Sequence, residues 1–250
     1  MRLQVDEIQD FYERCYTSST DGEKWAGWRA LGAVTKADHV VGLLERGGLA
    51  EGLETVAEIG CGDGSVLDEL ARRSIGTSRV GMDISSSAVA IAAGRPGISA
   101  AHQFDGARIP ADDQAFDLVL ATHVLEHVPA PEPLVDELLR VSRRALLIEV
   151  PLERNLSARR PVARAASEAA GHLHRFDRAQ VRRMVTRSGW RIRGELVDPL
   201  PLAVHAFGAE TSADRARARV KWLIRSGLTL WPGLGERVIT LHYALIATPG

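Results

Sequence analysis

The chain has little cysteine, few aromatic residues and no long apolar run. Its two cysteines, Cys15 and Cys61, lie far apart and offer neither a disulfide framework nor the spacing of a metal site. No apolar run approaches the ~18 residues that a membrane-spanning helix needs, and the N-terminal MRLQVDEIQD carries acids where a signal peptide has an apolar core. We therefore expect a cytoplasmic protein without a transmembrane segment.

Charge of one sign is also missing overall. The formal net charge of -1 argues against a chain that binds nucleic acid through its total charge. Residues 153–193 are the exception, with eleven arginines against three acids, a local excess of +8. This segment fits a solvated helix face or an attraction for an anionic acceptor. RNA ranks last, because only Phe176 and Trp190 supply aromatic rings for base stacking there.

The pattern of apolar residues predicts a doubly wound α/β protein. Residues 1–50 look helical, with a helix stop at Gly47 and Gly48. Short β-type runs then alternate with amphipathic helical segments; the runs are TVAEIG, SRVGMDI, GISAAHQF, FDLVLAT and RALLIEVP. Strands separated by crossover helices imply a parallel sheet covered on both faces. Near the end of the chain, WRIRGELV and RVITLHYALIA predict an antiparallel hairpin at the sheet edge.

Three glycines, Gly60, Gly62 and Gly64, follow the first strand in VAEIGCGDGS. Ligands of open parallel sheets bind at such strand exits, and bare backbone lets a ligand approach the loop and the helix N-terminus. A nucleotide-like ligand is the first hypothesis. The dinucleotide pattern G-x-G-x-x-G would need glycine or alanine where Ser65 stands, which disfavours NAD or FAD.

Acidic residues follow the next two strands. Asp83 ends the second strand, where a carboxylate can accept hydrogen bonds from both ribose hydroxyls. The alternative is a helix cap, although Ser85 to Ser87 could cap instead. Asp105 follows the third strand, where it could accept from an adenine amino group; in F-D-G it is also a turn residue.

The motifs E-I-G-C-G-D-G, G-M-D-I, F-D-G-A and F-D-L-V-L-A-T-H-V-L-E-H-V, taken in this order, resemble the class I S-adenosylmethionine-dependent methyltransferases, in particular the group that includes small-molecule and UbiE-like enzymes. The resemblance covers roughly residues 53–151. It implies S-adenosylmethionine as cofactor and a Rossmann-like, doubly wound, seven-stranded sheet, mostly parallel with an antiparallel last strand.

The resemblance also implies a set of cofactor-binding residues. Gly60 and Gly62 would lie against the amino acid portion, and Glu58 would orient the loop or meet the ammonium group. The complete set of matching positions is Glu58, Gly60, Cys61, Gly62, Asp83 at the ribose, Ile84 packed on the adenine, Asp105 at its amino group, Gly106, and Thr122 at the methyl-bearing end.

We expect one domain, 1–250, with four parts. Its parts are an N-terminal helical cap at 1–50, a cofactor-binding core at 53–151, an acceptor-side and lid region at 152–237, and the last strand at 238–250. An amphipathic helix over 213–230 is predicted to be a lid over the acceptor pocket. Alternatively, it leans on a membrane surface or admits a lipid-linked substrate. Four aromatic residues of the N-terminal part either close over the cofactor or belong to the core: Tyr12, Tyr16, Trp25 and Trp28.

Methyl transfer to an oxygen of high pKa needs a base, and histidine suits that role near neutral pH. We name His123 and His174 as catalytic candidates. The alternative for His123 is structural, because His123 and His127 stand four residues apart and could simply support a helical turn. The cluster of His123, Glu126 and His127 could bind a metal only with further ligands from residues 149–177, such as Glu149, Glu153 or His174. Its spacing is not a recognised zinc pattern such as H-E-x-x-H, so no metal is expected.

The sequence thus predicts an S-adenosylmethionine-dependent methyltransferase that methylates a hydroxyl of a small molecule or sugar. The arginine-rich segment would suit an anionic acceptor, and the helix over 213–230 a lipid-linked one. The alternatives are an N-methyltransferase of a small amine, a non-catalytic regulatory protein that binds S-adenosylmethionine, and a dinucleotide-dependent oxidoreductase. Turnover and the choice of cofactor distinguish these functions.

Overall fold

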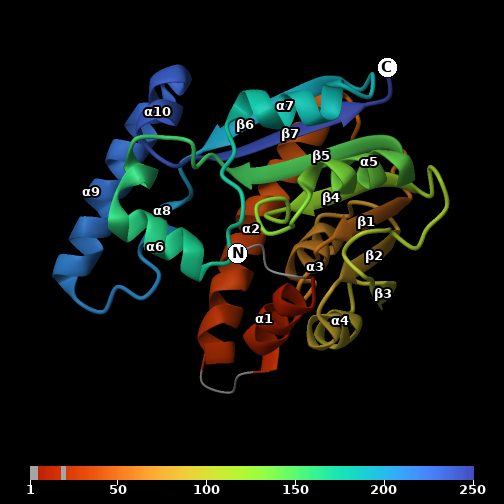
Figure 1. Cartoon of the computed structure of the whole chain (residues 1–250), viewed down its shortest axis with the longest axis horizontal. Helices are drawn as coiled ribbons and strands as arrows, with labels where there is room; N and C mark the ends of the chain where they lie inside the picture. Colours follow the sequence, from red (N-terminus) through yellow and green to blue (C-terminus); the bar gives the residue numbers. More distant parts are fainter. Residues whose placement is uncertain (1–4, 18–20) are drawn as a thin grey trace.

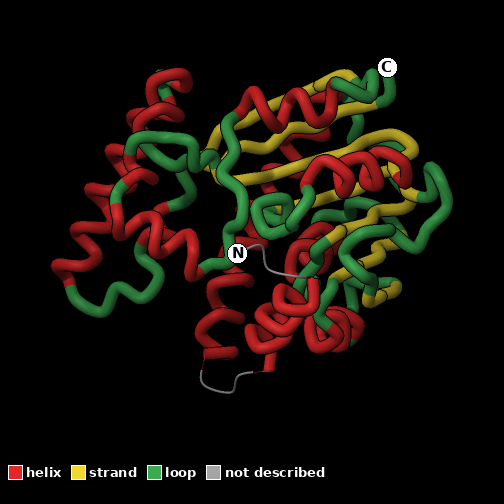
Figure 2. The backbone as a smooth tube through the Cα atoms, viewed as in Figure 1, coloured by secondary structure: helices red, strands yellow, loops and turns green. Residues whose placement is uncertain are grey.

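The computed structural model describes residues 5–17 and 21–250, with side chains throughout except at 5–7, 21–25 and 232. It contains a seven-stranded sheet in the order β3-β2-β1-β4-β5-β7-β6, flanked by helices (Figures 1 and 2). All neighbouring pairs are parallel except β5 with β7 and β7 with β6. The predicted doubly wound sheet with an antiparallel last strand is confirmed.

The strands are β1 (Thr55–Ile59), β2 (Ser78–Asp83), β3 (Ala100–Gln103), β4 (Phe116–Thr122), β5 (Ser142–Pro151), β6 (Arg191–Asp198) and β7 (His242–Thr248). The helices are α1 (Val5–Thr17), α2 (Asp21–Gly47), α3 (Ser65–Arg72), α4 (Ser86–Ala93), α5 (Pro131–Val141), the 3-10 turn η1 (Ser157–Arg159), α6 (Pro161–Ala169), α7 (Arg178–Thr186), α8 (Leu202–His205), α9 (Ser212–Thr229) and α10 (Pro232–Val238).

The core lies on both faces of the sheet, because successive strand side chains point to opposite faces. Ala57 and Ile59 belong to the layer beneath α5 and α7, which stand in front of the sheet in Figure 1. Val56 and Leu118 belong to the layer beneath α2 and α3 on the other face. Both layers are fully buried, so the sheet holds its strand ends in fixed positions.

The last strand is shorter than predicted. Helix α10 continues to Val238, and β7 begins only at His242. Because β7 runs antiparallel between β5 and β6, its first residue lies beside the end of β5, with His242 paired to Pro151 and to Asp198. The edge strand of the hairpin is therefore β6, and β7 lies inside the sheet.

Helix α9 packs with the opposite orientation to an ordinary amphipathic helix. Val220, Leu223 and Ile224 are 56–60% exposed, whereas the guanidinium of Arg225 points inward and donates to the carbonyl oxygens of Pro199 and Thr240. The helix lies with α6, α8 and α10 at the end of the molecule away from β3 (Figure 1). None of the helices within residues 5–17 and 21–250 is long and apolar enough to cross a membrane.

Candidate active site

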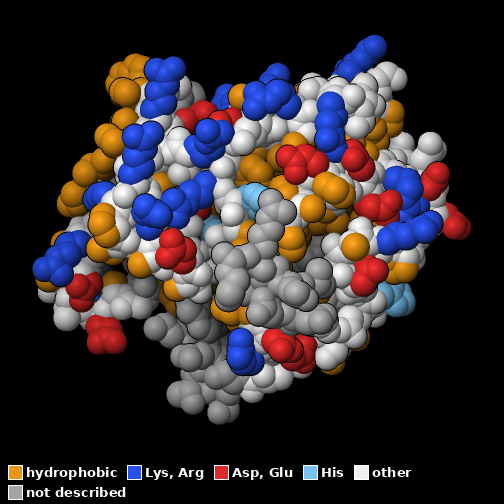
Figure 3. Space-filling model, in the orientation of Figure 1, with side chains coloured by type: hydrophobic (Ala, Val, Ile, Leu, Met, Phe, Trp, Pro, Cys, Tyr) orange, Lys and Arg blue, Asp and Glu red, His pale blue; other side chains and the backbone are white. Residues whose placement is uncertain are grey.

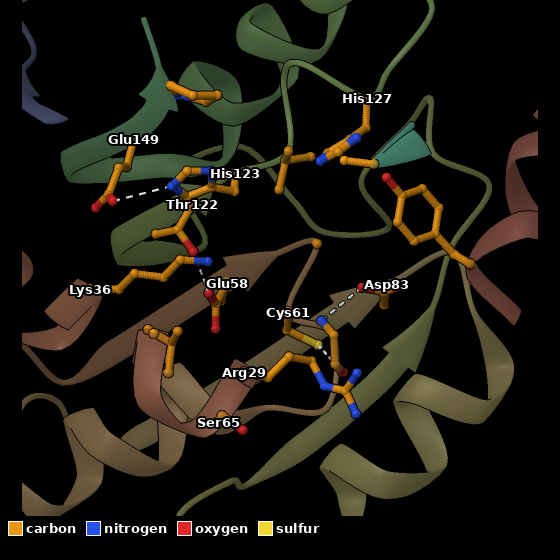
Figure 4. A pocket seen from close by; sticks show the side chains of 18 of the residues that line it. Arg29, Lys36, Glu58, Cys61, Ser65, Asp83, Thr122, His123, His127 and Glu149 are labelled. Atoms are coloured by element: carbon orange, nitrogen blue, oxygen red, sulfur yellow. Dashed lines mark hydrogen bonds and ion pairs between the residues drawn. The ribbon is translucent and has the colours of Figure 1, made fainter. Parts of the chain in front are cut away.

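A cavity of about 560 Å³ opens at the carboxyl edge of the sheet. Its walls are the residues that end β1, β2, β4 and β5, the first residue of β7, and side chains from α1 and α2 (Figure 4). This is the edge at which ligands of open α/β sheets bind. The volume falls within the range of about 300–1,000 Å³ typical of small-molecule sites.

The glycine loop after β1 is crowded by its neighbours. Gly60 has φ +74°, and a Cβ there would lie 2.4 Å from Cγ2 of Val124. At Gly62, φ is +54° and a Cβ would lie 2.5 Å from the hydroxyl of Tyr16. Both the left-handed backbone and the close approach require glycine. The loop therefore presents bare backbone to the cavity.

Asp83 is buried at the end of β2 and holds this loop. Its Oδ2 accepts a hydrogen bond from the Gly62 amide at 2.8 Å, and its Oδ1 accepts one from the Ser85 amide at 2.9 Å. Burial raises the pKa of its carboxyl, against these hydrogen bonds. The N-cap of α4 is the hydroxyl of Ser85, which accepts from the Ala88 amide. Capping thus falls to Ser85, and Asp83 lines the cavity.

Glu58 and Thr122 join the ends of β1 and β4. The Thr122 hydroxyl donates to Oε1 of Glu58 at 3.0 Å, while Oε2 is buried without a hydrogen-bond partner among the described residues. Burial raises the pKa of Glu58 to about 8, opposed by the charge of Lys36. All three side chains line the cavity (Figure 4), so Glu58 supplies a carboxyl group with a free acceptor atom there.

The two N-terminal helices cover the cavity. Tyr12, Tyr16 and Trp28 line it, while the side chain of Trp25 lies outside the described residues. In α1, the carboxylate of Glu13 accepts from the hydroxyls of three serines at the start of α4: Ser85, Ser86 and Ser87. In α2, Arg29 donates to Oδ2 of Asp63 at 2.9 Å and lies 4.7 Å from the centre of the Tyr16 ring. These contacts tie α1 and α2 to the glycine loop and to α4.

Most of the predicted cofactor residues meet in this cavity, but Asp105 does not. Eight of the nine line it, namely Glu58, Gly60, Cys61, Gly62, Asp83, Ile84, Gly106 and Thr122. Asp105 is exposed and is not among the lining residues; its Oδ1 accepts from the amides of Ala107 and Arg108. The structure therefore gives it the turn role that F-D-G also allowed.

The two histidines predicted to be catalytic are separated. His123 lines the cavity, together with His127 and His172. His174 does not: its ring stacks on Phe176, and its Nε2 lies 3.2 Å from the Pro129 oxygen. The position of His174 is a correction to the sequence prediction. Residues 172–177, which hold His172 and His174, form no regular helix or strand, so periodicity could not show which of these two faces the cavity.

His123 lies between two buried carboxylates. Its backbone is left-handed, with φ +59°, and its Nδ1 lies 3.0 Å from Oε1 of Glu126 while its Nε2 lies 3.3 Å from Oε1 of Glu149. Burial lowers the pKa of His123, but these carboxylates outweigh it and raise the pKa overall. The two carboxylates therefore favour the protonated form of His123, which suits it less well to the role of a base than an ordinary histidine.

His127 has the opposite character. Burial lowers its pKa below the ordinary histidine value. Its Nδ1 lies 3.2 Å from the carbonyl oxygen of Gly171, which can accept a hydrogen bond but cannot donate one. The proton of the neutral ring therefore lies on Nδ1 and leaves a lone pair on Nε2. The sequence analysis named His123 and His174, and not His127, as the catalytic candidates.

Three further residues complete the site, and the sequence analysis gave no role to two of them. Glu149 is buried in β5, with its Oε2 3.0 Å from Nδ1 of His39 in α2 and its Oε1 3.7 Å from Nδ1 of His242 in β7. The neighbouring carboxylates raise the pKa of His39 to about 10 despite its burial. The available signal was topological, because an antiparallel last strand must begin at the carboxyl edge of the sheet.

The arginines of residues 153–193 lie outside the cavity, although Glu153 and His172 of the same segment line it. None of the eleven arginines is among the lining residues, and several form ion pairs on the surface, for example Arg154 with Asp177 and Arg187 with Asp136. The cavity cations are instead Arg29 and Lys36. These arginines therefore form a solvated surface rather than a wall of the cavity.

Comparisons with known proteins agree with this geometry. The profile of a family described as "methyltransferase domain" matches residues 27–194. No curated protein sequence matches the chain. Three similar solved structures share 15–18% identity with it. The alignment with the [4+2]-cyclase SpnF covers 99% of this chain and 97% of the cyclase, at 17% identity and a TM-score of 0.64. The alignment with magnesium protoporphyrin IX methyltransferase from Synechocystis PCC 6803, solved with SAH, covers 96% of this chain and 100% of that enzyme, at 18% identity and a TM-score of 0.58. The alignment with geranyl diphosphate C-methyltransferase from Streptomyces coelicolor A3(2) covers 86% of this chain and 78% of that enzyme, at 15% identity and a TM-score of 0.61.

The residues present fit S-adenosylmethionine. Glycine at positions 60 and 62 keeps side chains off the loop beside the cavity, and the unpartnered oxygen of Glu58 suits a cationic ammonium group, whose charge would favour the ionised carboxylate. Asp83 keeps lone pairs for ribose hydroxyls, because each of its oxygens accepts one backbone hydrogen bond. Ile84, Phe104 and Gly106 form an apolar wall for the adenine.

Proposed function

The chain belongs to the methyltransferase domain family and uses S-adenosylmethionine as its cofactor, and on that premise we propose that it methylates a hydroxyl group of a small molecule or sugar. The observation that carries this proposal is the meeting of Asp83 and His127 in one cavity. The first marks the cofactor side and the second offers a neutral imidazole nitrogen to the acceptor. Bound S-adenosylmethionine supplies an electrophilic methyl group, and alignment of the acceptor with it provides much of the catalysis.

We assign the base role to His127. Nδ1–H of its ring is directed at the Gly171 oxygen, and Tyr12 packs edge-on against the ring with centroids 5.5 Å apart. These contacts fix the ring and its tautomer. Nε2 then takes the proton of the acceptor hydroxyl as the oxygen forms its bond to the methyl carbon and the carbon–sulfur bond breaks. His123 instead holds a position beside Thr122.

The acceptor side of the cavity is mixed in character. Glu153, His172, Leu200 and Val204 line it, with the His172 Nδ1 2.9 Å from Oε2 of Glu153. Polar groups beside apolar ones suit a small molecule with several hydroxyls, such as a sugar. A neutral amine acceptor needs no strong base. A loss of methyl transfer without His127 would therefore favour an oxygen acceptor over a nitrogen acceptor.

The predicted lid contributes to the cavity through other elements than α9. Leu200 and Val204, around the start of α8, line the cavity, whereas no residue of α9 does. Exposed apolar side chains here are Leu223 of α9, Leu230 and Trp231 between α9 and α10, and Leu234 of α10; apolar and basic side chains lie side by side on this part of the surface (Figure 3). This surface supports a lipid-linked acceptor over a free anion. Co-sedimentation of the protein with anionic vesicles tests that choice, and no binding would favour a soluble acceptor.

The direct test is a screen for methyl transfer. Libraries of hydroxyl and amine acceptors are incubated with the protein and isotopically labelled S-adenosylmethionine, and methylated products are detected by mass. Methylated oxygen supports the proposal, and methylated nitrogen replaces it. Tight cofactor binding without turnover favours the non-catalytic alternative.

A further inference from the structure

Three buried polar atoms face one another at the ends of adjacent strands. They are Nε2 of His123 after β4, Oε1 of Glu149 in β5 and Nδ1 of His242 at the start of β7. None has a hydrogen-bond partner within the described residues. The histidine nitrogens lie 3.3 Å and 3.7 Å from the carboxylate oxygen, and ligand atoms of the three residues lie within 4.8 Å of one another. A buried polar atom left without a partner destabilises the folded protein, so a ligand for these three atoms is expected.

A second layer of contacts fixes these groups from behind. Oε1 of Glu126 lies 3.0 Å from Nδ1 of His123, and the His123 amide donates to the Glu149 carbonyl oxygen at 2.9 Å. His39 bridges Oε2 of Glu149 at 3.0 Å and Oδ2 of Asp198 at 3.2 Å. A carboxylate behind a histidine and a donor behind a carboxylate are the supports that orient metal ligands in proteins.

We propose that His123, Glu149 and His242 bind one divalent transition-metal cation of the Zn²⁺ type. Tetrahedral coordination with bonds of about 2.0–2.1 Å places ligand atoms about 3.3 Å apart, which is close to the observed spacing. Two imidazoles and one carboxylate suit zinc better than magnesium or calcium, which prefer oxygen ligands. The three ligands lie at the ends of three different strands, β4, β5 and β7, so no short sequence motif contains them. The proposal replaces the expectation from the sequence that no metal is bound.

The site keeps an open position on the cavity side. All three residues line the cavity, and His123 directly follows Thr122 (Figure 4). Three protein ligands with a fourth position free is the arrangement of catalytic zinc sites. This step of the inference rests on the proposed function: the acceptor oxygen would be the fourth ligand, and the cation would lower the pKa of the acceptor hydroxyl before His127 takes its proton.

Two other arrangements compete with this one. In the first, a proton replaces the metal, and His123 donates to both Glu126 and Glu149. In the second, the cation binds a neighbouring cluster of Glu126, His127 and His172, whose ligand atoms also lie within 4.8 Å of one another. That cluster is less in need of a cation, because among its atoms only Oε2 of Glu126 is buried without a partner in the described chain.

Zinc binding to the purified protein separates these arrangements. The protein is treated with a chelator, dialysed, and titrated with Zn²⁺; bound zinc is measured by elemental analysis, and Co²⁺ serves as a spectroscopic substitute. We expect one equivalent of zinc and a tetrahedral Co²⁺ spectrum. His242→Ala should weaken zinc binding by about 10-fold or more, whereas the matched variant His172→Ala should retain it.

Several results overturn the site. Wild-type protein that binds S-adenosylmethionine but takes up no zinc contradicts it, as does zinc that is lost in His172→Ala and kept in His242→Ala. If His242→Ala does not fold, as judged by circular dichroism, His242→Gln replaces it, and the wild-type titration stands by itself. Failure of the proposed methyl transfer is recognised separately, by absent S-adenosylmethionine binding or absent turnover in zinc-loaded protein.

Discussion

Asp83 and Gly62 meet across the ends of two neighbouring strands, where Oδ2 of the aspartate accepts a hydrogen bond from the glycine amide at 2.8 Å. This bond fixes the glycine loop and the carboxylate relative to each other. Because a Cβ on Gly62 would lie 2.5 Å from the Tyr16 hydroxyl, the same loop is also closed from above by α1. The cofactor side of the cavity is thus a single connected unit.

Asp83→Ala is expected to weaken binding of S-adenosylmethionine by about tenfold or more, or about 1.4 kcal/mol, because charge-assisted hydrogen bonds to the ribose are lost. Asp105→Ala is the matched control, since Asp105 is exposed outside the cavity. Calorimetric titration measures both. Equal losses in the two variants would contradict the assignment of the ribose to Asp83.

Gly60→Ala is expected to destabilise the protein more than Gly48→Ala. Both glycines have left-handed backbones, with φ +74° and +65°, which cost an L residue about 1–2 kcal/mol. Only Gly60 also has a close neighbour, with Val124 Cγ2 2.4 Å from the added Cβ, whereas nothing lies within 4 Å at Gly48. Urea denaturation gives the two free energies of unfolding. Similar values would show that the loop relaxes away from Val124.

Glu58 should make the protein less stable as pH rises. Its pKa is raised by burial to about 8 in the folded state, against about 4.3 in an unfolded chain. Between these values the unfolded state loses a proton that the folded state keeps, so the free energy of unfolding falls by up to about 1.4 kcal/mol per pH unit. Glu58→Gln removes this contribution. We expect the difference in stability between variant and wild type to grow from pH 5 to pH 8; a constant difference would contradict a protonated Glu58.

His127→Ala should slow methyl transfer while leaving the affinity for S-adenosylmethionine nearly unchanged. His174→Ala is the control, because its ring lies outside the cavity. Burial lowers the pKa of His127, so the acid limb of the activity profile should lie below the ordinary histidine pKa of about 6.5. An activity profile with its acid limb above that value, or equal rates for His127→Ala and wild type, would assign the base elsewhere.

The sequence predicted the sheet correctly, and eight of the nine residues proposed for the cofactor line one cavity, because both patterns are encoded locally. Apolar runs ending in Gly60, Asp83 and Thr122 define strands and their exits, and parallel strands bring those exits to one edge. Which histidine faces the cavity could not be predicted. His172 and His174 lie in a segment without helix or strand, where no periodicity relates the direction of one side chain to that of the next. Glu149 and His242 meet only through the pairing of β5 with β7, a contact between residues distant in sequence.

The helix α9 was predicted as an element but not in its packing. Its apolar stripe indicated a buried face, yet Val220, Leu223 and Ile224 are exposed, and Arg225 satisfies two backbone carbonyls inside. An arginine that binds buried carbonyl oxygens can direct a helix against its own hydrophobic pattern. Amphipathicity predicts a helix, but it does not say which partner covers the apolar side.

Titration calorimetry of the purified protein with S-adenosylmethionine, its demethylated product and NADH tests the central claim most directly. The cavity built by Gly60, Asp83 and Glu58 predicts micromolar binding of the first two ligands and none of NADH. Binding of NADH alone would contradict the account, because it would make the glycine loop a dinucleotide site.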